Sequence, residues 1–394
     1  MKQQVAGRRG VMRAIVGLVA GAMIPLGAAQ AADPVKVGLM LPATGTFAAL
    51  GTAITNGFKQ YVDEQGGTLA GREIQFFTVD DESDPSKATE NANRLVVRDR
   101  VDVLVGTVHS GVALAMARVA RQRDTTFIVP NAGADDLTRG FCAPNMVRSS
   151  FSNWQPAYAM GKAAAERGAK TAVTLTWNYA AGQEAVAGFK EAFAEAGGEV
   201  VREMALPFPN VEFQPFLTEI ASLRPDAVYV FFAGGGATRF VNDYVAAGLK
   251  ERIALYSSGF LTDGTLEAMG GNGEGLITAL HYAEGLDTPR DNAFREGYVS
   301  RYGIVPDVYA VQGYDAAQLL HAGLEAVGGD ASKKAELRAA MRAATIDSPR
   351  GNFTLSAAGN PIQDIYLREA RGTENIVIGI AAEALADPAT GCNL

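Results

Sequence analysis

The stretch VKVGLMLPATG, residues 35–45, decides the fold class of this chain. Val35–Leu41 is a short, mostly apolar run of the kind that forms a buried strand of a parallel sheet. Pro42 and Gly45 then form a loop, and residues 50–62 continue with apolar side chains at helical spacing. A strand, a loop and a helix in this order predict an α/β domain with a loop at the carboxyl edge of its sheet, where such folds hold ligands.

A separate leader, residues 1–32, comes before this strand. Its start is basic, and its apolar core, residues 14–26, is too short to span a membrane. Ala29-Gln30-Ala31 has the small-residue pattern of a cleavage site. We therefore expect a signal peptide rather than a buried N-terminal helix, and export by the general or the twin-arginine route. Because the leader contains no Cys that could carry a lipid, we expect a protein free in the periplasm.

The composition indicates an acidic protein with more than one domain. The chain has 394 residues with 35 basic and 43 acidic side chains; four of the basic residues lie in the leader, which leaves 31 against 43. Such a negative charge disfavours binding to nucleic acid. About 360 residues after the leader are more than one ordinary hydrophobic core holds, so two domains are expected.

Two successive series of strand and helix patterns follow the leader. Strand patterns lie at residues 35–41, 73–79, 101–105 and 126–130, and again at 171–176, 199–206, 227–232 and 253–257. Later come helical patterns at 292–301, 311–326 and 333–344, a turn-rich hairpin at 350–359, and strands at 366–371 and 375–380. The pattern predicts an α/β fold with two doubly wound parallel-sheet lobes. Since no Pro/Gly/Ser linker separates them near residues 145–153, we expect a hinge rather than a tether.

Two loops admit other interpretations. Residues 233–238, AGGGAT, follow an apolar strand and open a helix, as a phosphate loop does, but Arg239 stands where G-x-G-x-x-G needs a glycine. VHSG at 108–111 is a near miss for the nucleophile elbow G-x-S-x-G. An exported serine hydrolase that uses Ser110 and His109 is therefore the alternative of another class. The same hydroxyl, imidazole and helix-start N–H groups also suit a bound carboxylate.

A third loop, PNAGAD at residues 130–135, ends the next strand pattern. Asn131 offers an amide, and Ala132 and Gly133 permit close approach of the backbone; an ordinary turn is the alternative. The three His residues are widely spaced, and the acidic run at 80–84 lacks the EF-hand spacing, so no metal and no cofactor are expected.

With these loops, the chain resembles the periplasmic substrate-binding proteins of branched-chain amino-acid type (Leu/Ile/Val-binding-protein-like) ABC transporters, which have the type I periplasmic binding fold. The features that carry the resemblance are VGLMLPATG at 37–45, NG at 56–57, LAGREI at 69–74, residues 80–87, VGTVHS at 105–110, VPNAG at 129–133, NYAAG at 178–182 and residues 309–315. Their order and spacing, over essentially the whole chain after the leader, matter more than any single motif.

The resemblance implies two lobes joined by a three-crossing hinge, with a ligand cleft between lobes that close over it. We expect residues 33–150 and 282–355 in the first lobe, and residues 151–281 and 356–394 in the second. The loops at Ser110 and Asn131 would hold a ligand carboxylate. The expected ligand-binding residues are Phe47, Leu50, His109, Ser110, Asn131, Ala132, Gly133, Tyr179, Ala181, Gly235, Phe260 and Tyr309.

One departure from the family pattern bears on the ligand. Amino-acid binders of this family place an acidic residue near 258–260 to meet the ligand ammonium, but YSSGFL at 256–261 contains none, and Gly133 stands where a hydroxyl residue is common. A buried ammonium without a carboxylate is costly. We therefore expect a non-enzymatic solute-binding component of an ABC importer for an aromatic acid, such as a benzoate or phenylpropanoate derivative. A branched-chain or aliphatic amino acid, with its ammonium at Asp263, is the alternative.

The remaining expectations concern the cysteines and the partners. Cys142 and Cys392 are the only Cys residues of a chain expected to be exported, so we expect one intramolecular disulfide, with two unpaired thiols as the alternative. The resemblance implies a monomer that delivers its small-molecule ligand to an inner-membrane ABC permease.

Overall fold

The first of two sheets is built from the N-terminal part of the chain. The computed structural model describes Met1, Gln4, residues 6–7 and Asp33–Leu394. The predicted signal peptide therefore lies almost wholly outside the described residues. The sheet has the order β2-β3-β1-β4-β5-β6 and is parallel except for β2. Its strands are β1 (Val35–Leu41), β2 (Thr68–Leu69), β3 (Arg72–Asp80), β4 (Val103–Val105), β5 (Thr126–Val129) and β6 (Met146–Arg148).

The second sheet repeats this arrangement and adds antiparallel strands at one side. Strands β8, β7, β9, β10 and β11 are parallel, whereas β14 runs antiparallel to β11 and pairs with β13 and β15. The strands are β7 (Thr171–Trp177), β8 (Glu199–Leu206), β9 (Ala227–Phe231), β10 (Ala254–Ser258), β11 (Ile277–Leu280), β12 (Thr345–Ile346), β13 (Phe353–Leu355), β14 (Pro361–Arg371) and β15 (Glu374–Leu385). The prediction of two parallel-sheet lobes is confirmed.

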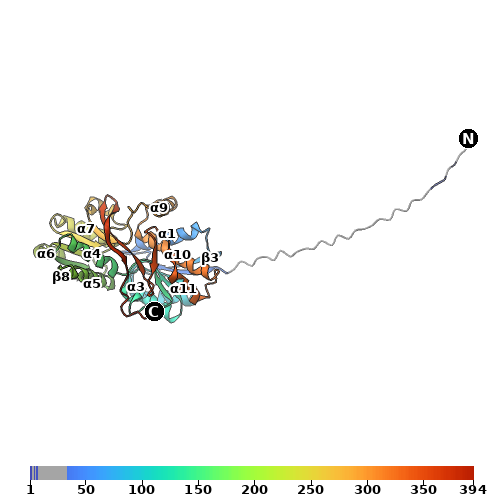
Figure 1. Ribbon diagram of the computed structural model, residues 1–394, viewed down its shortest axis with the longest axis horizontal. Coiled ribbons are helices and arrows are strands. Elements are labelled where there is room, and N and C mark those ends of the chain that lie inside the picture. The colour runs from blue at the N-terminus through green and yellow to red at the C-terminus, as the bar shows by residue number, and fades with distance from the viewer. Residues whose placement is uncertain (2–3, 5, 8–32) are drawn as a thin grey trace. The chain divides into compact units, whose positions relative to one another are not determined.

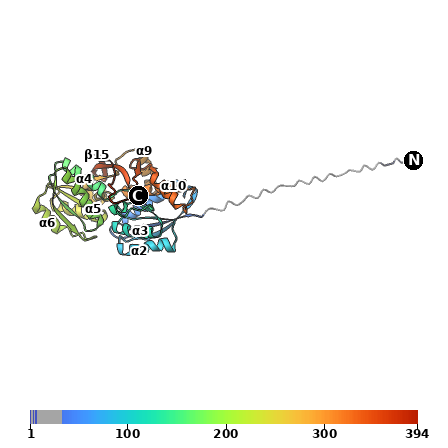
Figure 2. The same ribbon diagram turned by 60° about the horizontal axis from the view of Figure 1, so that its bottom comes forward.

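Helices cover the sheets. The first series contributes α1 (Ala48–Glu64), α2 (Pro85–Asn93), η1 (Arg94–Arg98), α3 (Ser110–Gln122) and η2 (Asp135–Thr138). The second contributes α4 (Trp154–Glu166), α5 (Ala180–Glu195), α6 (Gln214–Leu223), α7 (Gly234–Ala246), η3 (Gly259–Leu261), α8 (Leu266–Met269) and η4 (Gly270–Gly273). The later helices are α9 (Pro289–Tyr302), α10 (Val308–Ala326) and α11 (Lys334–Ala343). Helices α4 to α7 lie on one side, and α1, α10 and α11 on the other (Figure 1); the turned view keeps α4 to α6 apart from α2 and α3 (Figure 2).

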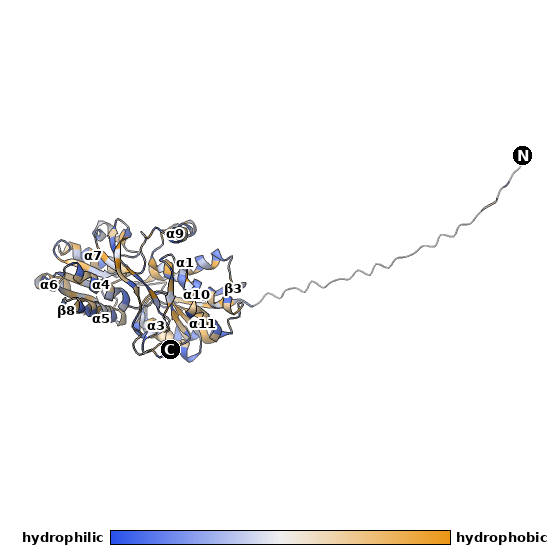
Figure 3. Cartoon of the chain, in the orientation of Figure 1, coloured by the Kyte–Doolittle hydropathy of each residue, from blue (hydrophilic) through white to orange (hydrophobic). Residues whose placement is uncertain are grey.

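Both faces of the first sheet are buried, which explains the apolar runs in the sequence. Val37 and Leu39 of β1 pack with side chains of α1 and α10, whereas the next residue, Met40, packs with side chains of α2 and α3. Alternate side chains of a strand point to opposite faces, so a run without polar residues supplies two cores. Hydrophobic colour accordingly concentrates on the strands inside each lobe (Figure 3).

The chain passes between the lobes three times. It leaves the first sheet after β6, returns to α10 and α11 after β11, and crosses again between β13 and β14. Strands β12 and β13 hydrogen-bond toward the second sheet, while Ile346, Phe353 and Leu355 on them pack in the core of the first lobe. These strands therefore belong to the hinge, and the lobe limits predicted from the sequence stay a prediction.

The C-terminal tail returns from the second lobe to the first. After β15, Asp387 forms an ion pair with Arg139 at 2.9 Å, and Cys392 forms a disulfide with Cys142 across 250 residues of sequence. The end of the chain lies beside α3 (Figure 1). The predicted disulfide is confirmed, and it closes a loop that contains the whole second lobe.

Two features of the fold differ from the sequence prediction. Strands β14 and β15 are longer than the predicted late strands, because polar residues such as Gln363, Asp364 and Glu383 interrupt the apolar pattern in the parts that extend beyond the prediction. Strand β6 has three residues, too few to show a periodicity. Among the described residues, no helix is long and apolar enough to cross a membrane.

Candidate functional site: the cleft between the lobes

A narrow cleft lies where loops of both lobes face each other. The free volume of this cleft is only about 20 Å³, because side chains of both lobes nearly fill it. The lining residues are Phe47, Leu50, Val108, Ser110, Asn131, Gly133, Phe151, Asn153, Tyr179, Ala181, Phe231, Ala233, Phe260 and Tyr309. Most of them follow the carboxyl ends of parallel strands, which is the ligand-binding edge of open α/β sheets.

Ser110 and Asn131 form the polar side of the first lobe. They follow the neighbouring strands β4 and β5, so their loops lie next to each other. Ser110 is the first residue of α3, where backbone N–H groups have no partner inside the helix. The helix begins here because Nδ1 of His109 accepts a hydrogen bond from the N–H of Gly111 at 3.1 Å.

The crossing between β6 and α4 contributes Phe151 and Asn153. Nδ2 of Asn153 donates to Oγ of Ser110 at 3.3 Å and to Oε2 of Glu184 at 2.7 Å, and so links the two lobes. Burial raises the pKa of Glu184 to about 8, and the nearby Asp135 carboxylate adds to this shift. A Cβ atom at Gly133 would overlap with Phe151 and Asn153. The glycine that departs from the family pattern therefore makes room for these two side chains.

Aromatic side chains form the second-lobe wall. The ring of Phe260, in η3, lies 4.6 Å from that of Phe151 and 6.0 Å from that of Phe231, measured between centroids. Tyr179, which immediately precedes α5, packs against His109 of the first lobe at 4.9 Å. Rings from both lobes thus meet across the cleft, an arrangement that favours a flat apolar ligand body.

Tyr309 places a buried hydroxyl beside these rings. It is the second residue of α10, whose start is capped by Asp307, because Oδ1 of Asp307 accepts the N–H groups of Tyr309 and Ala310 at 3.0 and 3.1 Å. The Tyr309 hydroxyl has no hydrogen-bond partner among the described residues. Burial and the nearby Asp263 and Asp307 raise its pKa well above the ordinary value, so it remains a donor. A buried donor of this kind is costly until an acceptor reaches it.

The lining side chains carry no formal charge. Asp263, the acid suggested for a ligand ammonium, is fully buried outside the lining and forms an ion pair with Arg368 at 2.7 Å. Burial raises the pKa of Asp263 to about 7, although Arg368 acts in the opposite direction. The Arg368 guanidinium already pairs with the carboxylate that a ligand ammonium would need as its counter-charge.

The structure brings together nine of the twelve residues expected to bind the ligand. Phe47, Leu50, Ser110, Asn131, Gly133, Tyr179, Ala181, Phe260 and Tyr309 line the cleft. His109 lies behind it as a helix cap, Ala132 is buried below Asn131, and Gly235 is exposed on the solvent side of α7.

Five lining residues were missed by the sequence reasoning: Val108, Phe151, Asn153, Phe231 and Ala233. Val108 and Ala233 belong to loops that the sequence did single out, although neither was expected to bind the ligand. Phe151 and Asn153 belong to the hinge, whose side chains carry no periodic signal.

The geometry gives little support to a hydrolase. Among the described residues no hydrogen bond joins His109 to Ser110, and Nδ1 of His109 is engaged at the helix start. Burial lowers the pKa of His109 to about 4, which makes it a weak base. The described residues also contain no group of three or more His, Cys, Asp or Glu side chains that could hold a metal ion.

Comparison with known proteins identifies similar chains. A family model described as periplasmic binding protein matches residues 34–375. The Leu/Ile/Val-binding protein homolog 6 of Brucella abortus is 32% identical over 364 residues, which cover 90% of this chain and 92% of that protein.

Two solved structures are also similar. A solute-binding protein of an ABC transporter from R. palustris, in complex with benzoate, is 55% identical with a TM-score of 0.90, over 92% of this chain and 100% of that one. A solute-binding protein of an ABC transporter from Rhodopseudomonas palustris BisB5, in complex with 3,4-dihydroxybenzoic acid, is 34% identical with a TM-score of 0.86, over 91% and 99% of the two chains.

Proposed function

The chain belongs to the periplasmic binding protein family as a solute-binding protein of an ABC transporter, and from this premise we propose that its ligand is an aromatic carboxylate of the benzoate class. The ligand carboxylate lies toward Ser110 and Asn131, and its ring lies among Phe151, Tyr179 and Phe260. The lobes close over it as rigid bodies about the hinge.

The observation that carries this proposal is the convergence of three helix starts on a cleft without charged side chains. Helices α3, α5 and α7 begin at Ser110, Ala180 and Gly234, and each start adjoins or includes a lining residue, whereas the start of α10 is capped by Asp307. The N-terminus of a helix carries a partial positive charge and open N–H groups. Together with the Tyr309 hydroxyl, these groups stabilise an anion without a basic side chain.

The same cleft disfavours an α-amino acid. An ammonium group needs a carboxylate or several acceptors when it is buried, whereas the starts of α3, α5 and α7 disfavour a cation. Asp263 is paired with Arg368 and lies outside the lining. Two similar solute-binding proteins were solved with benzoate and with 3,4-dihydroxybenzoic acid, which supports an aromatic acid for this chain.

The setting of this function follows from the family and from the leader. We propose that residues 1–32 direct the chain to the periplasm and are removed there. The remaining protein, without a lipid anchor, works as a monomer and passes its ligand to an inner-membrane permease. The chemistry stays binding and release, because the family is one of transport proteins rather than enzymes.

Calorimetry and thermal-shift measurements on the purified protein test the ligand assignment. The panel contains benzoate, 4-hydroxybenzoate, 3-phenylpropanoate, leucine and valine. Ligands that bind only the folded state raise the melting temperature, so an aromatic acid should give the largest shift. Leucine or valine giving the largest shift, with the aromatic acids silent, would overturn the assignment.

Two variants test whether the ligand binds in the cleft. Ser110→Ala removes a hydroxyl that faces the ligand and should weaken benzoate binding about 10-fold, the effect of one lost hydrogen bond to a charged group. Ser222→Ala, on the exposed surface of α6, is the matched control and should bind benzoate as the wild type does. Equal affinity of both variants would remove Ser110 from the site.

A further inference from the structure

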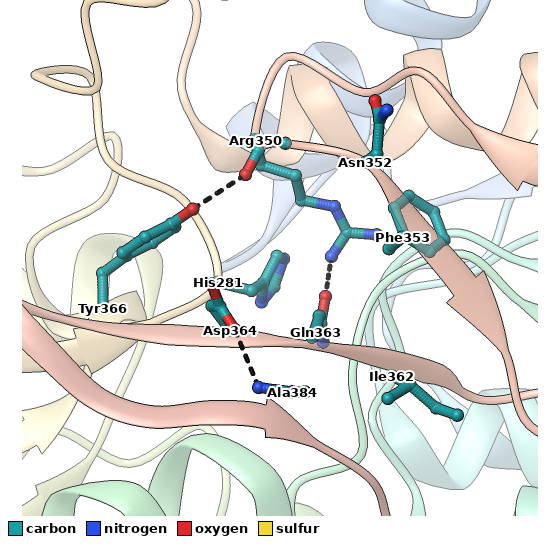
Figure 4. A pocket seen from close by; sticks show the side chains of 10 residues that line it. His281, Arg350, Asn352, Phe353, Ile362, Gln363, Asp364, Tyr366 and Ala384 are labelled. Atoms are coloured by element: carbon teal, nitrogen blue, oxygen red, sulfur yellow. Dashed lines mark hydrogen bonds between the residues drawn. The ribbon is translucent and has the colours of Figure 1, made fainter.

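A second pocket lies at the hinge behind the cleft. Its free volume is about 260 Å³, and the residues that line it include His281, Arg350, Gln363 and Tyr366. Figure 4 shows His281, Arg350 and Gln363 among the side chains that line this pocket. His281 follows β11, is 1% exposed, and stacks on the ring of Phe151 with centroids 5.5 Å apart. Since Phe151 lines the cleft, one aromatic ring separates His281 from the ligand site.

A row of hydrogen bonds also joins His281 to the cleft. Nδ2 of Asn131 donates to Oε1 of Gln312 at 2.7 Å, and Nε2 of Gln312 lies 3.2 Å from Nε2 of His281. Gln312 and His281 are 0% and 1% exposed. Because Gln312 accepts through its oxygen, its nitrogen must donate to His281, so Nε2 of His281 carries no proton. Burial and the nearby Arg350 and Arg368 hold the pKa of His281 well below its ordinary value, so the ring is neutral, and in this arrangement its proton is on Nδ1.

The row has a second arrangement that satisfies the same contacts. If His281 carries its proton on Nε2, it donates to Oε1 of Gln312, and the Gln312 amide then donates to Oδ1 of Asn131. Both arrangements keep a neutral ring and leave Nδ1 of His281 without a protein partner among the described residues. They differ at Asn131: the first leaves its amide oxygen for the cleft, and the second leaves its amide nitrogen.

We propose that His281 is a positioning residue that sets, through Gln312, which atom of the Asn131 amide faces the ligand. The inference rests on the proposed carboxylate ligand and extends it. A carboxylate accepts hydrogen bonds only, so it draws the row into the arrangement in which His281 is protonated on Nε2. A ligand group that donates, such as a carboxamide or hydroxyl, is served by the other arrangement.

The first experiment needs no ligand. Nitrogen-15 NMR of protein labelled at its three His residues reports the tautomer of each ring, and His281→Phe identifies the His281 signals. The wild type should show the proton on Nδ1. Asn131→Asp and Gln312→Glu each place an acceptor-only side chain in the row and should move the proton to Nε2. If it stays on Nδ1 in both variants, the row is not coupled and the proposal is wrong.

A matched control keeps the row intact. Ser149→Ala removes the hydrogen bond from Oγ of Ser149 to the backbone oxygen of Gln312 and leaves both amide groups in place. The His281 tautomer should be that of the wild type. Should Gln312→Glu fail to fold, Asn131→Asp alone decides the outcome, because it acts from the opposite end of the row.

The second experiment measures specificity as a ratio. Gln312→Glu fixes the Asn131 oxygen toward the cleft, so benzoate should bind at least 10-fold more weakly while benzamide changes less than 3-fold. Addition of benzoate to the wild type should also move the His281 proton to Nε2. An equal loss for both ligands would reduce Gln312 to a structural role. If no aromatic acid binds the wild type, the proposed function fails, and the ligand-free NMR result still decides the coupling.

Discussion

The hinge and the cleft of this protein handle buried polar groups in opposite ways. The hinge region, which includes Arg368 because it donates to the backbone oxygen of Tyr282 on the crossing after β11, contains two ion pairs with almost no exposure: Arg368 with Asp263 at 2.7 Å and Arg350 with Asp315 at 3.0 Å. The cleft, a few side chains away, presents hydroxyls, amides, helix starts and aromatic rings without a charged side chain. The buried charged side chains of the hinge region are therefore paired with each other, and none of them lines the cleft.

This difference shows why the two regions tolerate burial differently. A buried ion pair is held by its partner and by further hydrogen bonds, as when Arg350 also donates to the backbone oxygens of Ser149 and Ser150 and to the side chain of Gln363. Its loss costs the folded state. The cleft keeps donors such as the Tyr309 hydroxyl unsatisfied among the described residues, and this cost is recovered when a ligand supplies acceptors.

The strongest test of the comparison removes one charge from the hinge. Arg368→Met leaves Asp263 buried without its partner and should lower the free energy of unfolding by about 3–5 kcal/mol. Urea denaturation at pH 7 measures it. Arg368→Met combined with Asp263→Asn should recover most of the loss, and Arg202→Met, from an exposed pair with Glu219, should change little. Equal effects of the buried and the exposed variant would refute the distinction.

Loss of the Cys142–Cys392 disulfide should have the next largest effect on stability. Cys142→Ser with Cys392→Ser opens a loop of 250 residues that contains the whole second lobe. Loop-closure entropy predicts a loss of about 2–5 kcal/mol in the free energy of unfolding. Denaturation of the oxidised wild type and of the double variant measures it. Benzoate affinity should be nearly unchanged, because the disulfide lies outside the cleft lining; a large loss of affinity would contradict the separation of the two regions.

The cleft should respond in affinity rather than in stability. Gly133→Ala places a Cβ atom where Phe151 and Asn153 now lie, so the ring that faces the ligand must move. We expect benzoate to bind about 10-fold or more weakly, roughly 1.4 kcal/mol per tenfold, with a smaller change in melting temperature. Gly271→Ala is the control, because a Cβ atom there meets nothing within 4 Å. Unchanged affinity in Gly133→Ala would show that Phe151 does not contact the ligand.

The last prediction concerns the pH dependence of stability at Glu184, which accepts a hydrogen bond from Asn153 of the cleft. Burial raises its pKa to about 8, so the folded protein binds a proton that the unfolded chain releases near pH 4.5. The protonated Glu184 side chain therefore contributes to the free energy of unfolding, fully below pH 4.5. This contribution is lost as the pH rises from 4.5 toward 8. Glu184→Gln should flatten the fall in the unfolding midpoint between pH 5 and 8. An unchanged slope would mean that Glu184 is ionised in the folded protein.

Much of the fold could be predicted from the sequence because the two repeated series are locally encoded. Apolar runs such as Val35–Leu41 and Ala227–Phe231 are buried on both faces, so burial alone defines them. The helix beginning at Pro85 carries its own start signal, since Asp84 accepts the N–H of Ser86 at 2.8 Å. The long strands β14 and β15 could not be predicted in full, because their alternation depends on which face the hinge covers.

The candidate site also contains residues that the sequence predicts and residues that it does not. Loops after strands, such as those at Ser110, Asn131 and Tyr179, follow from the order of elements, because parallel strands end at one edge of a sheet. Phe151 and Asn153 could not be predicted from the order of elements, since no local sequence pattern distinguishes them. They line the cleft because the chain crosses between the lobes at this point. The role of Gly133 also needed coordinates, because the sequence shows a missing side chain and not what fills its place.

The sequence by itself determined the two α/β series, the loops that line the cleft, the disulfide partners and the family, because each rests on short-range pattern or on the count of a residue type. Only the tertiary structure decided which side chains meet across the lobes, that Asp263 is paired with Arg368, and that His281 reaches Asn131 through Gln312. These contacts join residues far apart in the chain. Their partners are chosen by packing at the hinge, and no local pattern encodes that choice.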